Sequence, residues 1–257
     1  MYDKLKSIIK KAIPSKLFFR LEGPLRRGLY LFYKGDNFQC NVCHKNLRAF
    51  VSSDHQHKVC PYCGSIERNR RLWDLLNQGY LESDPKILHF SPSRSLYRKF
   101  KKLHGSNYLS SDMSSDFISD TSMDITALDS KASEFDIIIC YHILEHVLDD
   151  RKAMDELYRV LDENGTCFIQ TPFKEGKIYE DRAIISEADR LAHFGQEDHV
   201  RIYSISGLQE RLEKSGFQVQ VASFNENSEN EYGFSSKESI MICKKKSKSR
   251  NSIEEYF

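Results

Sequence analysis

Two CxxC pairs lie in the first quarter of this chain, Cys40 with Cys43 and Cys60 with Cys63, and sixteen residues separate the pairs. Two thiolates on one tight turn supply half of a tetrahedral zinc site, and a second such turn at this distance completes it. Gly64 follows the second pair and permits the positive φ that such a turn needs. The spacing therefore predicts a zinc site made by these four cysteines.

Disulfide bonds and a redox-active CxxC are the alternative interpretations of the pairs. The other cysteines, Cys140, Cys167 and Cys243, are isolated in apolar surroundings, and we recognise no signal peptide. This usage is typical of a reducing compartment, where paired CxxC motifs usually bind metal. We therefore expect a cytoplasmic protein whose cysteine cluster holds zinc, although a nearby histidine could replace one sulfur.

The composition is that of an ordinary globular protein of 257 residues, with 40% apolar and 29% charged residues and a formal net charge of +1. Such a chain can hold one large domain and a small one. Residues 1–36 are basic, and Leu5 to Ile13 have the apolar spacing of an amphipathic helix until Pro14. We predict that this basic amphipathic lead packs on the main domain or makes weak contact with nucleic acid or a membrane surface. No apolar run approaches the roughly 20 residues of a membrane span.

Behind the cysteines, the sequence predicts a helix from Ile66 to about Tyr80, capped by Ser65. From Lys86 onward, short apolar strands alternate with amphipathic helices. The strand at 135–140 has almost no polar interruption, which is typical of a parallel sheet covered on both faces. The alternation predicts a doubly wound α/β fold. The predicted strands are 87–90, 108–111, 135–140, 166–170, 217–222 and 239–243, and the predicted helices are 96–103, 150–161 and 208–214.

The stretch 134–147, which contains the buried strand and the turn after it, resembles the fourth strand of class I S-adenosylmethionine-dependent methyltransferases. The next helix, which ends in Arg159-Val160-Leu161 before Asn164-Gly165, resembles the corresponding helix end of that family. Residues 201–217 resemble the region before its sixth strand. Together these similarities cover most of residues 86–243.

The whole chain is also similar to a bacterial group of methyltransferases that carry a zinc module before the catalytic domain. The two cysteine pairs, the step 64–68 into a helix, and the segment 194–201 carry this similarity. The resemblance implies a mostly parallel, seven-stranded, Rossmann-like sheet preceded by a small zinc-ribbon-like module. The parts are then the lead at 1–36, the zinc-binding module and connecting helix at 37–84, the methyltransferase domain at 85–243, and a polar tail at 244–257.

The resemblance implies an enzyme that moves a methyl group from S-adenosylmethionine to an acceptor. A small molecule or sugar is the favoured acceptor, and RNA or protein stays open. The loop after the first strand normally reads E/D-x-G-x-G-x-G, whereas 89–95 here contains no glycine. One interpretation is that serine hydroxyls and backbone amides receive the cofactor. The other is a catalytically inactive methyltransferase-fold scaffold, or a protein that binds nucleic acid or protein through its zinc module.

By resemblance, residues at the strand ends bind the cofactor: Asp112 accepts hydrogen bonds from the ribose hydroxyls, and Asp124 accepts from the adenine amino group. The full predicted set is His89, Ser91, Ser93, Asp112, Asp124, Tyr141 and His142. His142 and His199 are the predicted catalytic residues, as bases for a hydroxyl or protonated amine acceptor.

Two further segments bear on chemistry. The string 142–146 fits H-x-x-E-H, a metalloprotease signature. We set that interpretation aside, because the string directly follows a buried strand and the signature must lie within a helix. The long insert after Pro172, which contains 179–181, is predicted to form the acceptor pocket or a lid.

Overall fold

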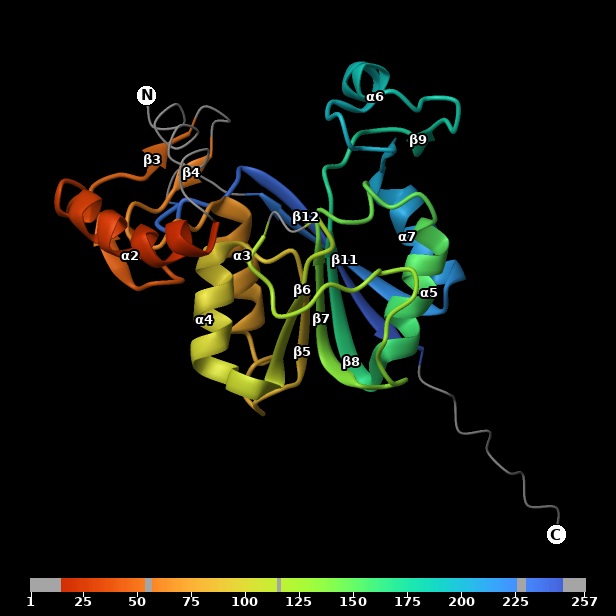
Figure 1. Cartoon of the computed structure of the whole chain (residues 1–257), viewed down its shortest axis with the longest axis horizontal. Coiled ribbons are helices and arrows are strands. Elements are labelled where there is room, and N and C mark those ends of the chain that lie inside the picture. Colours follow the sequence, from red (N-terminus) through yellow and green to blue (C-terminus); the bar gives the residue numbers. More distant parts are fainter. Residues whose placement is uncertain (1–14, 54–56, 115–116, 226–229, 247–257) are drawn as a thin grey trace, which may run out of the picture. The chain divides into compact units, whose positions relative to one another are not determined.

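The structure, a computed structural model, describes residues 15–53, 57–114, 117–225 and 230–246 (Figure 1). It divides into two compact units. The first extends to Met123 and includes Ala222–Ser239, and the second comprises Asp124–Val221 and the residues from Ile240 onward. The helix expected from Leu5 to Ile13 and most of the predicted polar tail lie outside the described residues.

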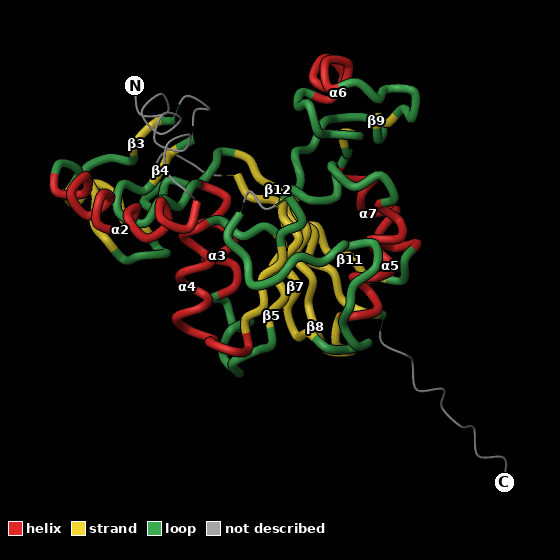
Figure 2. The backbone as a smooth tube through the Cα atoms, viewed as in Figure 1, coloured by secondary structure: helices red, strands yellow, loops and turns green. Residues whose placement is uncertain are grey.

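The first unit combines small antiparallel strand pairs with three α-helices and two parallel strands (Figure 2). Strands β1 and β2 pair, as do β3 and β4, and β5 runs parallel to β6. Both β5 and β6 coincide with strands predicted from the sequence. The elements are α2 (Ser15–Leu31), β1 (Lys34–Cys40), β2 (Lys45–Leu47), β3 (Val51–Ser52), β4 (Lys58–Val59), α3 (Glu67–Leu76), β5 (Ile87–Phe90), α4 (Arg94–His104), the 3₁₀ turn η1 (Gly105–Asn107) and β6 (Tyr108–Ser111).

An aromatic cluster joins the helices of this unit to its parallel strands. The rings of Trp73 in α3 and Phe100 in α4 lie edge to face at 5.5 Å, and Phe100 stacks on Tyr108 of β6 at 5.2 Å. All three side chains are buried. Edge-to-face and stacked pairs of this kind stabilise a core beyond the area that they bury.

Helix α3 is shorter than predicted, and Ser65 does not cap it. The helix begins at Glu67, its N-cap is Ile66, and it ends at Leu76. The Asn69 side chain caps the helix instead, because it accepts a hydrogen bond from the Ile66 amide at 3.2 Å. The Ser65 hydroxyl instead faces the cysteine cluster.

The second unit carries the central strands of the sheet with helices α5 and α7, which lie beside one another (Figure 1). Strand β7 runs parallel to β8, and six of its seven residues are buried, as its apolar sequence predicts. The elements are β7 (Phe135–Tyr141), α5 (Asp150–Val160), β8 (Leu161–Gln170), β9 (Tyr179–Glu180), α6 (Glu187–Phe194), β10 (Arg201–Ile202) and α7 (Ile205–Lys214).

The sequence predicted that Asn164-Gly165 ends helix α5, and this was wrong. The helix already ends at Val160, and Asn164-Gly165 lies within β8. A Cβ on Gly165 would lie 3.0 Å from the carbonyl oxygens of Phe135 and Asp136. The glycine therefore permits a close approach of β8 to β7.

Strands β11 (Phe217–Asn225) and β12 (Lys237–Lys245) complete a six-stranded sheet in the order β11-β12-β8-β7-β5-β6. Strand β12 is antiparallel to β8, in an otherwise mostly parallel sheet. The α/β fold is confirmed, but within the described residues the central sheet has six strands and not seven. Between β6 and β7, Thr121 makes only an isolated bridge to Ser111, in a polar stretch that has little apolar surface to bury. Among the described helices, none is both long and apolar enough to cross a bilayer.

Candidate functional site

The four cysteines of the first unit come together with the spacing of a metal site. Their sulfur atoms all lie within 4.8 Å of one another. The Sγ atoms of Cys40 and Cys63 are 3.6 Å apart, and those of Cys43 and Cys60 are 3.8 Å apart. Four bonds of about 2.3 Å from a tetrahedral zinc ion place sulfur atoms about 3.8 Å apart. The donor set therefore fits zinc in both chemistry and size.

The two cysteine turns share one backbone geometry. The amide of His44 donates to the Cys40 carbonyl at 2.7 Å, and the amide of Gly64 donates to the Cys60 carbonyl at 2.9 Å. Both donors have positive φ, 58° for His44 and 80° for Gly64. Each turn thus presents its two sulfurs in the same way. The imidazole of His44 lies against Lys99, 3.4 Å from its Nζ, and outside the four-sulfur cluster.

Polar groups of the connecting segment support this cluster. The Ser65 Oγ lies 3.3 Å from the Sγ of Cys40 and 3.2 Å from that of Cys63. Hydrogen bonds from neighbouring thiols, first of all Cys43, hold the pKa of Cys40 well below its usual range. The fully buried Arg70 donates to the Ser65 carbonyl at 2.8 Å, which ties the second turn to α3.

The ends of the parallel strands in this unit carry the predicted ribose-binding group. Asp112 follows β6 and is 4% exposed. Its Oδ1 accepts a hydrogen bond of 2.7 Å from the hydroxyl of Ser91, the first residue after β5. Its Oδ2 accepts from the hydroxyl of Ser114 at 3.0 Å and from the amide of Phe117 at 3.3 Å. Ser91 has a φ of 44°, so this glycine-free loop still takes a left-handed backbone conformation.

Two other predicted cofactor residues of this unit have structural partners. Ser93 is the N-cap of α4, and its hydroxyl accepts from the Leu96 amide at 3.4 Å. The side chain of His89 is buried beneath the loop, 3.2 Å from the Tyr108 hydroxyl, and burial lowers its pKa to about 3. Their roles in cofactor binding stay predictions.

In the second unit, the turn after β7 presents several titratable side chains. His142 has a φ of 56°, and its Nδ1 lies 3.3 Å from Oε1 of the buried Glu145. Residues 144–146 form a turn and not a helix. The H-x-x-E-H string therefore lacks the helix that the metalloprotease signature requires. His146 and His199 lie edge to face with ring centroids 4.6 Å apart. The structure thus places the predicted bases His142 and His199 around one turn.

The remaining predicted cofactor residues of this unit differ in exposure. Tyr141 is buried at the end of β7. Asp124 is exposed and accepts hydrogen bonds of 2.8 Å from the amide and hydroxyl of Thr126. No contact in the described part of the chain tests the binding role of either residue.

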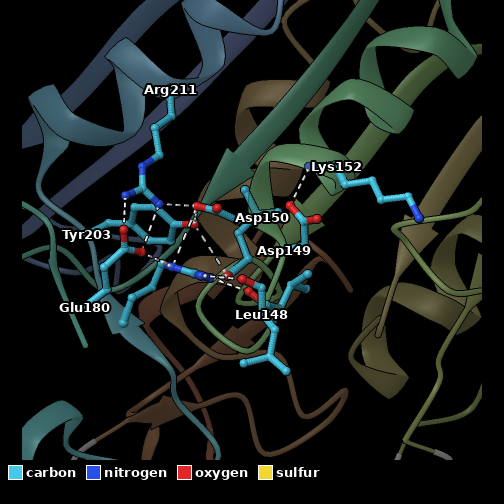
Figure 3. Close-up of polar contacts among 10 residues, drawn as sticks. Leu148, Asp149, Asp150, Lys152, Glu180, Tyr203 and Arg211 are labelled. Atoms are coloured by element: carbon cyan, nitrogen blue, oxygen red, sulfur yellow. Dashed lines mark hydrogen bonds and ion pairs between the residues drawn. The ribbon is translucent and has the colours of Figure 1, made fainter. Parts of the chain in front are cut away.

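A network of arginines and acids lies beside this turn (Figure 3). Arg211 donates to Asp150 Oδ2 at 2.6 Å and to Glu180, and the Tyr203 hydroxyl donates to the same Asp150 oxygen at 2.5 Å. Arg201 donates to Glu180 Oε2 at 2.9 Å. Hydrogen bonds from Arg211, together with the charge of Arg201, lower the pKa of Glu180 to about 2. The network therefore holds Glu180 ionised.

Arg201 also contacts the turn after β7. Its guanidinium donates to the carbonyls of Leu144 and Leu148 at 2.9 Å each, and so supports the turn after β7 from beneath. In the same region Asp149 caps α5 by accepting from the Lys152 amide at 3.1 Å (Figure 3).

A cavity of about 740 Å³ opens beside the network. The predicted insert forms much of its wall, through residues 180–182, Ile184, Ile185 and Arg190. Charged side chains of both signs line it: Asp149, Asp150, Glu180 and Asp181, with Arg151, Arg182, Arg190, Arg201 and Arg211. Such a cavity can receive a small polar molecule.

Residues 44–221 match the profile of a methyltransferase domain family, and the chain belongs to this family. No curated protein matches the chain. Among solved structures, a SAM-dependent methyltransferase from Archaeoglobus fulgidus is similar, with 15% identity and a TM-score of 0.49, over 68% of this chain and 91% of that one. An S-adenosylmethionine-dependent methyltransferase from Mesorhizobium loti has 14% identity and a TM-score of 0.46, over 67% of this chain and 97% of that one.

The sequence reasoning missed one group of side chains. Glu145, His146 and His199 each offer a ligand atom, and these atoms lie within 4.8 Å of one another. The signal was present in the H-x-x-E-H string at 142–146, but the third ligand lies more than fifty residues further along the chain. Only the folded chain brings it to the turn.

Proposed function

We propose that this chain is an S-adenosylmethionine-dependent methyltransferase that acts on a small polar acceptor, such as a sugar. Its membership of the methyltransferase domain family supports the proposal. The observation that carries it is the loop after β5. Ser91 there has the left-handed conformation that glycine usually supplies, and its hydroxyl orients the Asp112 carboxylate. Residues in such strained conformations are concentrated at functional sites.

The groups around Asp112 fit the ribose of the cofactor. A carboxylate has about four acceptor positions, and a pair of neighbouring hydroxyls needs two of them. The Ser114 hydroxyl that now occupies Oδ2 belongs to an exposed residue, so a ligand hydroxyl can take its place. Ser91 holds the other oxygen in position. The chain therefore presents a pre-oriented acceptor at the end of β6.

When bound, S-adenosylmethionine supplies a methyl group on a sulfonium, whose leaving group is neutral. The main task of the chain is then to position the reactants, and a base is needed only for a hydroxyl or protonated amine acceptor. His142 and His199 are the proposed bases. Binding by His89, Ser93, Asp124 and Tyr141 is part of the same proposal and rests on the family resemblance.

The cavity of the second unit is the proposed acceptor site. Its volume of about 740 Å³ lies within the range of sites for small molecules, and it is lined by charges of both signs. These side chains can donate to and accept from a polyhydroxyl or anionic acceptor. RNA or protein would need a more extended surface, so the cavity favours a small molecule.

We propose in addition that the four cysteines hold a structural zinc ion, as their sulfur spacing supports. A module of this size buries little apolar surface, and a bound metal can supply the missing folding free energy.

Calorimetric titration of the zinc-loaded chain with S-adenosylmethionine and S-adenosylhomocysteine tests the proposal. We expect micromolar binding that Asp112→Asn weakens at least about tenfold, because charge-assisted hydrogen bonds to the ligand are lost. Asp129→Asn, a change at an exposed acid nearby in the sequence, is the matched control and should bind as wild type does. No binding by wild type at millimolar ligand would contradict the proposal and favour the inactive scaffold.

A further inference from the structure

The turn after β7 presents an oxygen and two nitrogen atoms to one point. Glu145 and His146 come from this turn, and His199 comes from the segment before β10. Their ligand atoms lie within 4.8 Å of one another. The amide of Val200 donates to the Glu145 carbonyl at 2.9 Å, which fastens the His199 segment to the turn. We propose that these three side chains bind a divalent transition-metal ion, at a site separate from the four cysteines.

His146 has a partner that leaves one nitrogen for a metal. The Nδ1 of His146 lies 3.0 Å from Oδ2 of Asp198. The ring of His199 packs edge to face against that of His146, with centroids 4.6 Å apart. Metal-bound histidines almost always donate their other N–H to a carboxylate or a carbonyl, which fixes the tautomer and the orientation of the ring. The imidazole of His146 is therefore held as metal ligands are.

The carboxylate of Glu145 supplies an independent observation. The residue is 1% exposed, and neither of its oxygens meets a well-directed hydrogen bond within the described part of the chain. Its Oε1 lies 3.3 Å from the Nδ1 of His142. A buried carboxylate with so few directed hydrogen bonds is destabilising, and a divalent cation at this position would compensate for its charge.

The two imidazole rings have a separation that suits one ion. Their centroids are 4.6 Å apart and their planes cross at 84°. With metal–nitrogen bonds of about 2.1 Å, two ligating imidazoles have centroids about 4.5 Å apart at a right angle and about 5.2 Å apart at the tetrahedral angle. The observed separation lies at the right-angle end of this range, so the rings need only small movements.

The ligand set also indicates which ions fit. Two imidazoles and one carboxylate suit zinc, iron, cobalt or manganese, and they leave coordination positions open for water or a substrate oxygen. The cysteine cluster, by contrast, is complete with four sulfurs. With His199 as a metal ligand, His142 is the remaining base for the proposed methyl transfer. Cofactor binding at Asp112 does not involve the histidine site, so failure of the cofactor titration and failure of metal binding are separate results.

Cobalt binding to the full chain, with zinc already loaded into the cysteine cluster, tests the inference. We expect one further equivalent of Co²⁺ with weak visible bands and no sulfur-to-metal charge-transfer absorption. Glu145→Gln and His199→Ala should abolish this equivalent. Asp198→Asn should weaken it about 10- to 100-fold, because it removes the partner that orients His146.

His193→Ala is the matched control, since His193 is exposed on α6 and outside the cluster, and it should bind cobalt as wild type does. Asp198 is also exposed, so its variant should fold even if a change at the buried Glu145 does not. The inference is wrong if wild type takes up no second equivalent at millimolar Co²⁺, or if folded Asp198→Asn and His199→Ala both bind it with wild-type affinity.

Discussion

A single buried carboxylate, that of Glu22, should account for a measurable part of the stability of the first unit. It lies in α2 and is 5% exposed. Arg26 of the same helix donates to it at 2.9 Å, and two residues of α4, Arg94 and Arg98, donate at 2.8 Å and 2.9 Å. Burial raises the pKa of this carboxyl, but the hydrogen bond from Arg94 and the charges of the arginines outweigh burial and lower the pKa to about 2.

The size of the effect follows from the pKa. A fall from the ordinary value of 4.5 to about 2 corresponds to about 3 kcal/mol, at about 1.4 kcal/mol for each pH unit. Because the pKa is depressed in the folded chain, this contribution is fully present above about pH 4.5 and is lost as the pH falls towards about 2. Glu22→Gln imitates the protonated state at every pH. It should therefore lower the free energy of unfolding by about 3 kcal/mol at neutral pH and by much less at about pH 2.

Urea unfolding of wild type and Glu22→Gln at a series of pH values measures this difference. Loss of the proposed zinc ion at low pH would affect both proteins, so only the difference between them is compared. Glu210→Gln neutralises an exposed glutamate paired with Lys214 and should leave stability close to that of wild type. The reasoning fails if the Glu22 variant differs from wild type by less than about 1 kcal/mol at neutral pH, or if the difference stays constant down to about pH 2.

Two further changes test other parts of the structure. Cys60→Ser should release the zinc and loosen residues 37–80, and unchanged metal content and hydrogen exchange would show that the zinc assignment is wrong. Tyr203→Phe removes the buried hydroxyl that donates to Asp150 at 2.5 Å. It should lower the free energy of unfolding by about 1–3 kcal/mol, measured in urea, and an unchanged midpoint would contradict the network drawn for the second unit.

The cysteine turns and the strands could be predicted because their causes are local. The spacing of two CxxC pairs and the glycine at position 64 describe one backbone turn, and the structure repeats that turn at His44. The apolar run of β7 allows little besides a buried strand. Prediction was weaker for the polar stretch before Met123, where neither periodicity nor apolar residues decide between strand and loop.

Helix α2 could not be predicted, because its own sequence argues against it. Gly23, Pro24 and Gly28 all disfavour a helix interior, yet the helix runs from Ser15 to Leu31. The carboxylate of Glu22 binds arginines of α4 more than seventy residues away, and that contact exists only in the folded unit. Tertiary packing here outweighs local propensity.

The sequence by itself determined the cysteine cluster, the α/β class and the methyltransferase resemblance, since each is written in short contiguous motifs. Only the tertiary structure decided which side chains share a site. Glu145 and His146 are neighbours in the sequence, but His199 reaches them because the Val200 amide bonds back to the turn after β7. Side chains distant in the sequence meet where the backbone hydrogen bonds of the fold bring them. Such bonds cannot be predicted from the spacing of residues in a motif.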